Sequence, residues 1–272
     1  MLYNDSAMNR LNIRLVATDM DGTLLDSHKK LPLDFPLFVK EHHDDIRFVI
    51  ASGRQYYALK RDLKSISENL IFIAENGSLV FEKDKIIYQN VMAKKDVLLT
   101  LELLKHVPYA TPLLCGFDSA YMTCTDDEEM YHATMYYEKL SQVPSLEEVA
   151  RSKDIVKLAI YFRKQMAEKS STCFDSLPSN LKAVVSGVSW IDVANMDANK
   201  GSALQAIMKR FGIQREEAMA FGDYFNDVEL LQSVKYSYAM DNAHPYIKKI
   251  CAYHTSSNDE DGVMKVLRKL YD

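Results

Sequence analysis

Short apolar runs that each end in a polar residue constrain the fold of this chain more than any other feature. The runs are continuous rather than alternating, which is typical of β-strands covered on both faces. Amphipathic stretches of helix length separate them, so the pattern indicates βα units and a mostly parallel sheet. Ligands bind at the carboxyl edge of such sheets, where the polar residues are expected to gather. The first three runs are residues 15–18, 48–51 and 70–74, followed by Asp19, Ser52 and Glu75.

The middle of the chain, residues 83–187, has a different pattern. Along residues 156–162 large apolar side chains alternate with others such as Lys157, which predicts a strand with one buried face. Helices are predicted over 96–107 and 126–140, each opening with an aspartate suited to capping. This part of the chain therefore indicates a small α+β domain with an antiparallel sheet.

The parallel-sheet pattern resumes after this segment. A helix is predicted over 199–211, and Gly212 stands where a C-cap glycine belongs. Apolar runs follow at 218–221 and 236–240, and a last short strand is predicted at 251–255. The second half of the chain thus supplies more strands and helices of the same α/β type.

The two ends of the chain are therefore predicted to form one α/β domain with a doubly wound, mostly parallel sheet. This core comprises residues 1–84 and 188–272, and residues 85–187 form an inserted α+β cap. The chain has 272 residues, of which 47% are hydrophobic, enough to bury a core in each part.

Composition excludes several classes of function. The net charge is −5 and no stretch is a basic tract, so nucleic-acid binding is not expected. No apolar run approaches the roughly 20 residues that span a bilayer, and residues 1–10 lack the pattern of a secretory signal. The four cysteines form no CxxC pair, which favours reduced thiols. We expect a cytoplasmic protein without a membrane partner, and its oligomeric state, monomer included, stays open.

The strongest chemical signal is the sequence Asp19-Met20-Asp21-Gly22-Thr23, directly after a buried strand. Two carboxylates two residues apart on an extended chain point to opposite sides, but a turn at Gly22 can bring them towards one point. Placing two negative charges together costs free energy unless a cation lies between them. The pair therefore predicts a hard divalent ion with oxygen ligands, and Mg²⁺ is the default.

Other chain segments bring complementary groups to the same edge of the sheet. The segment 222–227 follows an apolar run and adds Asp223 and Asp227. The segment 52–54 adds a hydroxyl and exposed backbone N–H groups. Lys200 opens a helix, so its ammonium group and the helix N-terminus both favour an anion there.

Together these residues resemble the haloacid dehalogenase-like superfamily, and in particular its Cof-type hydrolase branch, whose large cap lies between the second and third motifs. The resemblance covers both core segments, whereas the cap matches only by position and pattern. Any one motif alone is weak, and the ordered set is specific. The motifs are Asp19-Met20-Asp21-Gly22-Thr23, Ala51-Ser52-Gly53-Arg54, Lys200-Gly201 and Gly222-Asp223-Tyr224-Phe225-Asn226-Asp227, with Glu75-Asn76-Gly77 and Ala239-Met240-Asp241-Asn242-Ala243 as accessory signatures.

The resemblance implies a role for each matched residue. Asp19 is the nucleophile that forms an aspartyl-phosphate, Asp21 is the general acid and base, and Lys200 binds the transferring phosphoryl group. The implied Mg²⁺ ligands are Asp19, the backbone carbonyl of Asp21, and Asp223, with Asp227 or Asn226 in support. The candidates on the substrate side are Thr23, Ser52, Gly53, Arg54, Asn76, Asn226 and Asn242.

The implied function is Mg²⁺-dependent hydrolysis of a small phosphorylated metabolite, such as a sugar phosphate or a phosphorylated cofactor. A cap over the site disfavours macromolecular substrates. Two alternatives stay open: a phosphotransferase or phosphosugar mutase with the same intermediate, and a non-catalytic metabolite sensor. Release of free phosphate distinguishes the first, and an intact set of catalytic residues argues against the second.

Overall fold

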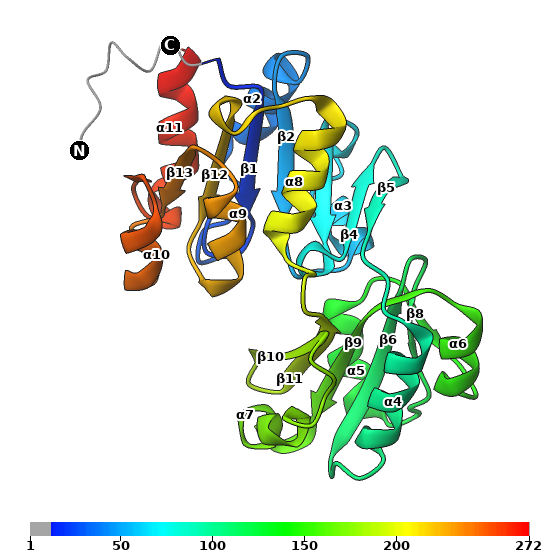
Figure 1. Ribbon diagram of the computed structural model, residues 1–272. Helices are drawn as coiled ribbons and strands as arrows, with labels where there is room; N and C mark the ends of the chain where they lie inside the picture. The colour runs from blue at the N-terminus through cyan, green and yellow to red at the C-terminus, as the bar shows by residue number, and fades with distance from the viewer. Residues whose placement is uncertain (1–11, 272) are drawn as a thin grey trace. The chain divides into compact units, whose positions relative to one another are not determined.

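The computed structural model describes residues 12–271, which form two compact units (Figure 1). The core unit comprises residues 12–56, Lys60–Tyr88 and 199–271. The inserted unit comprises Gln89–Ala198 together with Tyr57–Leu59. Within the described residues, no helix is long and apolar enough to cross a membrane.

The core unit is built on an eight-stranded sheet in the order β14-β13-β12-β1-β2-β3-β4-β5. The central strand β1 pairs in parallel with β12 on one side and β2 on the other. The pairing of β3 with β4 is antiparallel. The predicted doubly wound, mostly parallel sheet is therefore confirmed. Its strands are β1 (Leu15–Asp19), β2 (Arg47–Ala51), β3 (Leu70–Ala74), β4 (Leu79–Glu82), β5 (Lys85–Gln89), β12 (Ala218–Gly222), β13 (Tyr236–Ala239) and β14 (Tyr253–His254).

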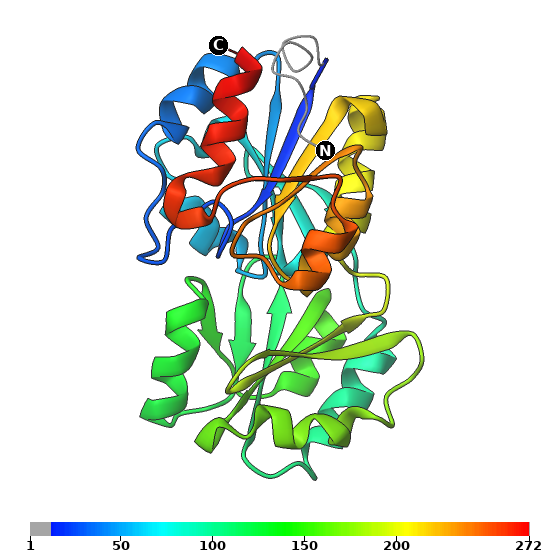
Figure 2. The same ribbon diagram turned by 90° about the vertical axis from the view of Figure 1, so that its left-hand side faces the viewer.

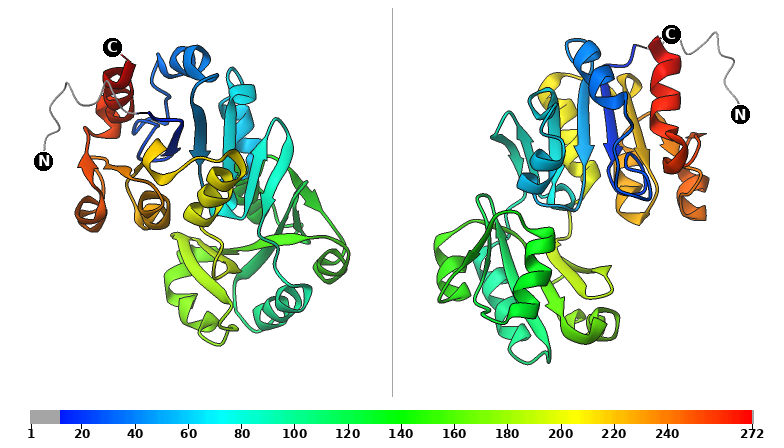
Figure 3. Two further views of the ribbon diagram at one scale, coloured as in Figure 1. Left: turned by 45° about the horizontal axis from the view of Figure 1, so that its top comes forward. Right: turned by 180° about the vertical axis from the view of Figure 1, so that it is seen from behind.

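Helices cover both faces of this sheet, which explains the continuous apolar runs. Every residue of β1 and β3 is buried. Figure 2 shows α2 and α11 on one face and α8 and α9 on the other, and the right-hand view of Figure 3 looks onto the α2 and α11 face. The helices are α2 (Phe35–His42), α3 (Tyr56–Asp62), α8 (Lys200–Phe211), α9 (Val228–Gln232), α10 (Pro245–Ile250) and α11 (Gly262–Tyr271).

Helix α8 begins and ends where the sequence predicts. The side chain of Asn199 accepts a hydrogen bond from the backbone N–H of Ser202, and the Ser202 side chain completes the capping box. Gly212 takes the left-handed conformation, with φ at 61°, and closes the helix. These two signals fix Lys200 as the first helical residue.

The inserted unit contains a six-stranded sheet in the order β10-β11-β9-β6-β7-β8. Strand β9 pairs antiparallel with both β6 and β11, as an α+β unit requires. The strands are β6 (Ala110–Gly116), β7 (Ala120–Met122), β8 (Leu140–Gln142), β9 (Ile155–Phe162), β10 (Leu181–Gly187) and β11 (Trp190–Asn195), and the helices are α4 (Lys94–Leu104), α5 (Asp127–Tyr136), α6 (Leu146–Ser152) and α7 (Ala167–Ser170).

The prediction that β9 has one buried face is wrong, because all eight of its residues are buried. On one face its apolar side chains pack with α4 and α6. On the other face the Tyr161 ring stacks on His132 of α5, with ring centroids 4.8 Å apart. Lys157 is buried on β9 and pairs with Asp192, at 3.3 Å. Lys157 interrupts the apolar sequence of β9 and so suggested an exposed face, but its charge is buried with that of Asp192.

The two helix-capping aspartates predicted for the inserted unit have different outcomes. Asp126 caps α5 by accepting hydrogen bonds from the N–H groups of Glu128 and Glu129. Asp96 does not cap α4, because that helix begins two residues earlier, at Lys94 after Ala93. Its carboxylate is instead buried and accepts a hydrogen bond from the side chain of Asn180.

Both joints between the units lie later in the chain than the expected boundaries of 84/85 and 187/188. Strand β5 extends the core sheet, so the chain leaves the core unit after Tyr88. Strand β11 pairs with β9 and belongs to the inserted sheet, so the chain returns to the core unit at Asn199. Strand pairing, which the sequence pattern does not display, decides both positions.

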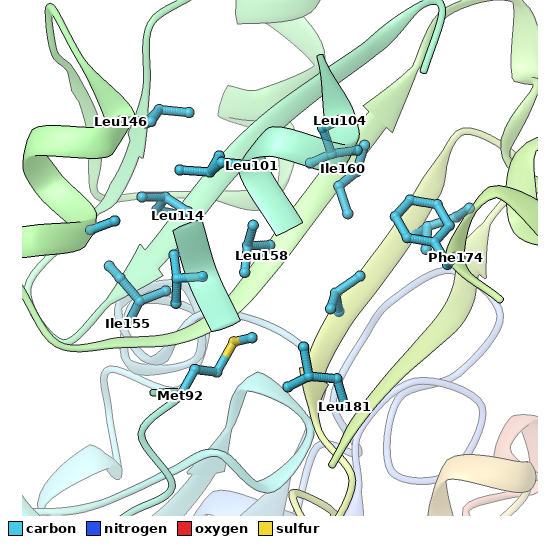
Figure 4. Packing of buried hydrophobic residues seen from close by; sticks show 14 of the residues in the cluster. Met92, Leu101, Leu104, Leu114, Leu146, Ile155, Leu158, Ile160, Phe174 and Leu181 are labelled. Carbon is cyan, nitrogen blue, oxygen red and sulfur yellow. The ribbon is translucent and has the colours of Figure 1, made fainter. Parts of the chain in front are cut away.

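The inserted unit has its own apolar core (Figure 4). Leu101 and Leu104 of α4 belong to the same cluster as Leu114 of β6 and as Leu158 and Ile160 of β9. Burial of these side chains stabilises the unit by about 1.5–3 kcal/mol for each residue.

We predict that Leu158→Ala lowers the free energy of unfolding of the inserted unit by about 2–5 kcal/mol, because it leaves a cavity in this cluster. Leu99→Ala on α4 is the matched control. Leu99 is 49% exposed, so its truncation changes the stability by about 0.5 kcal/mol or less. Urea denaturation followed by circular dichroism measures both, and equal effects would contradict the assignment of this core.

Candidate active site

A buried lysine links two carboxylates at the carboxyl edge of the core sheet. Lys200 is fully buried, and its Nζ donates to Oδ1 of Asp19 at 2.5 Å and to Oδ1 of Asp227 at 2.7 Å. Burial by itself lowers the pKa of the Lys200 ammonium, but the two carboxylates outweigh it and raise that pKa. Lys200 is therefore held as a cation at the end of β1.

A third carboxylate crowds this pair. One oxygen from each of Asp19, Asp223 and Asp227 lies within 4.8 Å of the others. Burial, together with the neighbouring carboxylates, raises the pKa of Asp19 to about 8 even though Lys200 opposes the shift. Burial and the charge of Asp227 raise the pKa of Asp223 to about 6. The cluster thus holds more negative charge than one lysine neutralises, and its all-oxygen donors fit Mg²⁺.

Two residues of the first motif fix the carboxylate of Asp223. The hydroxyl of Thr23 donates to its Oδ1 at 3.1 Å. Gly22 lies so close that a Cβ there would be 2.6 Å from its Oδ2. Thr23, expected on the substrate side, is buried and uses its hydroxyl to orient this carboxylate.

Asp227 braces the loop that carries Asp223. Its Oδ2 accepts hydrogen bonds from the backbone N–H groups of Asp223, at 3.0 Å, and Tyr224, at 3.3 Å. Its Oδ1 accepts the bond from Lys200. Both oxygens of this fully buried carboxylate therefore connect other members of the site.

Asp21 faces cations instead of carboxylates. Its oxygens accept hydrogen bonds from Nε of Arg54 at 2.9 Å, from the second terminal nitrogen of Arg54 at 2.5 Å, and from Nζ of Lys29 at 2.7 Å. Partial burial alone raises the pKa of Asp21, but the bonds from Lys29 and Arg54 outweigh it and lower that pKa. In the protein alone the pKa of Asp19 is therefore raised and that of Asp21 is lowered. This order is the opposite of the one expected for a nucleophile and a general acid, and a divalent cation bound at Asp19 would lower its pKa.

Sequence reasoning missed Lys29. It lies in a surface turn, where a lysine is ordinarily a solvated side chain. The carboxylate of Asp26 closes this turn by accepting from the N–H groups of His28 and Lys30. The turn directs Lys29, whose φ is 61°, back to Asp21. Aspartate often forms a turn by accepting a hydrogen bond from the backbone two residues later. Asp26 was therefore a turn signal in the sequence that could have indicated the position of Lys29.

The loop after β3 joins three of the expected site segments. The N–H of Asn76 donates to the carbonyl of Ser52, and Oδ1 of Asn76 accepts from the side chain of Asn226 at 3.3 Å. A Cβ at Gly53 would lie 2.9 Å from the Asn76 side chain. These four residues are therefore packed together at one edge of the sheet.

Asn242 lies behind the turn of the first motif. Its side-chain N–H donates to the carbonyl of Gly22 at 2.7 Å, and its Oδ1 accepts from the backbone N–H of Asn258 at 3.1 Å. Its amide, expected on the substrate side, therefore ties this turn to the C-terminal part of the core unit.

The sequence profile of the haloacid dehalogenase-like hydrolases matches residues 16–267, which is nearly the whole chain. The chain belongs to this family. The hydrolase is 29% identical over 265 residues to the 5-amino-6-(5-phospho-D-ribitylamino)uracil phosphatase YbjI of Escherichia coli, covering 96% of this chain and 97% of the relative. It is 27% identical over 252 residues to the HMP-PP phosphatase of Serratia proteamaculans, covering 87% of each chain.

Solved structures share the fold of the hydrolase. A protein of Streptococcus mutans UA159 superposes on the hydrolase with a TM-score of 0.81 at 30% identity, covering 94% of this chain and 98% of the other. A Thermotoga maritima protein shares the fold, with a TM-score of 0.83 at 22% identity, over 96% and 98% of the two chains.

We predict that Gly77→Ala damages the site of this hydrolase. Gly77 has φ at 100°, and a Cβ there would lie 2.1 Å from the carbonyl oxygen of Asn199, next to Lys200. Displacing that peptide by about 1 Å lowers kcat by about 100-fold. The measurement is phosphate release from p-nitrophenyl phosphate.

Gly212→Ala is the matched control. Gly212 also has positive φ, at 61°, but a Cβ there meets nothing within 4 Å. The substitution costs about 1–2 kcal/mol of backbone strain and leaves kcat near the wild-type value. Similar losses of kcat in both variants would mean that strain, and not the contact with Asn199, is responsible.

Proposed function

We propose that this hydrolase is a Mg²⁺-dependent phosphatase of small phosphorylated metabolites that forms an aspartyl-phosphate on Asp19. The observation that carries the proposal is the clustering of Asp19, Lys200, Asp223 and Asp227 at one edge of the core sheet. Phosphoryl transfer depends on positioning and on stabilising negative charge, and this cluster is suited to both.

In the proposed first step, an oxygen of Asp19 attacks phosphorus and the bond from phosphorus to the leaving oxygen breaks. Asp21 donates its proton to that oxygen. Lys200, with the hydroxyl and N–H groups of segment 52–54, binds the phosphoryl oxygens. Asp21 then takes a proton from water, which attacks phosphorus and releases phosphate and free Asp19.

The proposed Mg²⁺ ligands are Asp19, the backbone carbonyl of Asp21, and Asp223, and Asp227 supports them through the backbone of residues 223 and 224. The cation would neutralise the carboxylates and keep Asp19 ionised. The support for this assignment is geometric, since one oxygen each of Asp19, Asp223 and Asp227 lies within 4.8 Å of the others. Burial and neighbouring carboxylates also raise the pKa of Asp19 and of Asp223.

Arg54 and Lys29 give Asp21 a way to change its proton affinity during the reaction. In the free protein both cations bond to Asp21 and lower its pKa. A phosphate dianion attracts the same cations, and bonds that move from the carboxylate to phosphate raise the pKa of Asp21. We propose that substrate binding thereby prepares Asp21 to carry the proton that the leaving oxygen needs.

The proposed substrates are small phosphorylated metabolites, either sugar phosphates or phosphorylated cofactors and their precursors. The two curated relatives are named for a phosphorylated ribitylamino-uracil and for HMP-PP, which supports this class. The cytoplasmic location and the absence of a nucleic-acid partner stay predictions of the sequence.

We predict that Asp19→Asn reduces phosphate release from a panel of phosphorylated metabolites with Mg²⁺ to the uncatalysed background, because the amide is not a nucleophile. Asp44→Asn, a change at a side chain that is 92% exposed, is the control and keeps the wild-type rate.

Borohydride treatment of the wild-type enzyme during turnover should convert Asp19 to homoserine, which mass spectrometry detects. Near-normal release by Asp19→Asn would reassign the nucleophile, and transfer to alcohols without free phosphate would indicate a phosphotransferase.

We predict that Thr23→Val raises the Mg²⁺ concentration for half-maximal activity about tenfold, because Asp223 loses the hydroxyl that orients it. Asp223→Asn raises that concentration further. Thr100→Val is the control: Thr100 is also buried and also donates a hydrogen bond, to the Asp96 carbonyl in the inserted unit. An unchanged Mg²⁺ dependence in Asp223→Asn would remove Asp223 from the ligand set.

A further inference from the structure

Three exposed aromatic side chains gather in one place on the core unit. Within the described residues of this unit, the exposed Phe and Tyr side chains are Tyr224, Phe225 and Tyr246, which are 56%, 47% and 44% exposed. The Phe225 ring contacts Tyr224, Tyr246 and His244, with centroids 5.1, 5.9 and 4.5 Å away. We call these four residues the aromatic patch.

The aromatic patch adjoins the carboxylate cluster. Tyr224 and Phe225 follow β12, whereas His244 and Tyr246 follow β13 at the start of α10, and both segments leave the same sheet edge as Asp19. The N–H of Tyr224 donates to Asp227, the carboxylate that holds Lys200. The N–H of His244 donates to the carbonyl of Asp223 at 2.9 Å. Two members of the patch are therefore one hydrogen bond away from the proposed metal and phosphate groups.

The patch is also ordered in advance. Nδ1 of His244 accepts a hydrogen bond from the N–H of Tyr246 at 3.2 Å, so in the neutral ring Nε2 carries the proton. The rings of Phe225 and Tyr246 are nearly parallel, with an interplanar angle of 25°. Such a surface offers flat faces for stacking, and its polar groups are the phenol hydroxyls and an imidazole N–H at the ring edges.

We propose that the aromatic patch binds the leaving group of the substrate and selects phosphate esters that carry a flat unsaturated ring. The inference rests on the proposed phosphatase function and deepens it. An aromatic ring gains stacking on these faces, whereas the hydroxyls of a polyol need more donors and acceptors than the patch provides. Exposed aromatic side chains side by side are unfavourable in water, and the patch adjoins the phosphate groups, which favours the substrate as its occupant.

The test compares two esters with the same number of carbon atoms and similar leaving-group pKa, 2-phenylethyl phosphate and 2-cyclohexylethyl phosphate. We expect kcat/KM of the wild-type enzyme to be about fivefold higher for the phenyl ester, since stacking favours the flat ring. In Phe225→Leu, which keeps an apolar side chain but removes the π face, this ratio falls to about one. Tyr246→Leu gives a second, independent reduction.

Phe211→Leu is the matched control. Phe211 is the last residue of α8, and Arg47, the first residue of β2, lies over its ring at 3.8 Å, so it lies at the opposite edge of the sheet from the patch. This variant keeps the wild-type ratio. A ratio near one in the wild type, or an equal fall in Phe211→Leu, would overturn the proposal.

Three further outcomes bear on this inference, and the first two separate it from the proposed function. If both esters release phosphate at equal rates in every variant, the phosphatase stands and the patch does not select a ring. If neither ester nor any metabolite releases phosphate with Mg²⁺, the proposed function itself fails and the inference falls with it. If Phe225→Leu changes the sedimentation coefficient and leaves the ratio intact, the patch is a contact between copies of the chain, which also overturns the proposal.

Discussion

The buried ammonium of Lys200, held between Asp19 and Asp227, is the interaction on which the site depends. Removing these charges from water costs several kcal/mol for each ion, so the surrounding backbone must fix them closely. Glycine permits this approach, because a Cβ at Gly201 would lie 2.4 Å from the backbone of Glu229, and one at Gly77 would strike Asn199. These glycines thus let the start of α8 pack closely against its neighbours, which holds the Lys200 cation in place.

The same edge of the sheet keeps two carboxylates in opposite environments. Burial and the neighbouring carboxylates raise the pKa of Asp19 despite Lys200. For Asp21, two residues later, bonds from Lys29 and Arg54 outweigh partial burial and lower the pKa. Gly22, with φ at 81°, begins the turn directly after Asp21. In the proposed function, a bound cation near Asp19 and a phosphate dianion near Asp21 would each oppose the local shift. The proposed ligands would therefore change the proton affinity of both carboxylates.

The sequence predicted the parts of the fold that depend on local pattern. Apolar runs predicted β1, which ends at Asp19, and β2, which ends just before Ser52. Capping residues predicted the helix between Asn199 and Gly212. The burial of Lys157 and of Asp96 was not predicted, because a buried polar group is recognisable only with its partner. The partners, Asp192 and Asn180, are 35 and 84 residues away along the chain. The motif acids were predicted from order and spacing. Lys29 was missed because a turn directs it to Asp21.

The aromatic patch bears on where the selectivity of such an enzyme can reside. The proposed chemistry requires the metal and phosphate groups, but it does not require particular side chains at residues 224 and 225, which lie within the fourth motif. Rings at these positions lie one or two residues from Asp223 and share its loop. Their distance from the reacting phosphorus is thereby set by the backbone that orients the proposed metal ligand. Recognition of a flat leaving group then needs no separate binding domain, because the loop that holds Asp223 also presents the stacking surface.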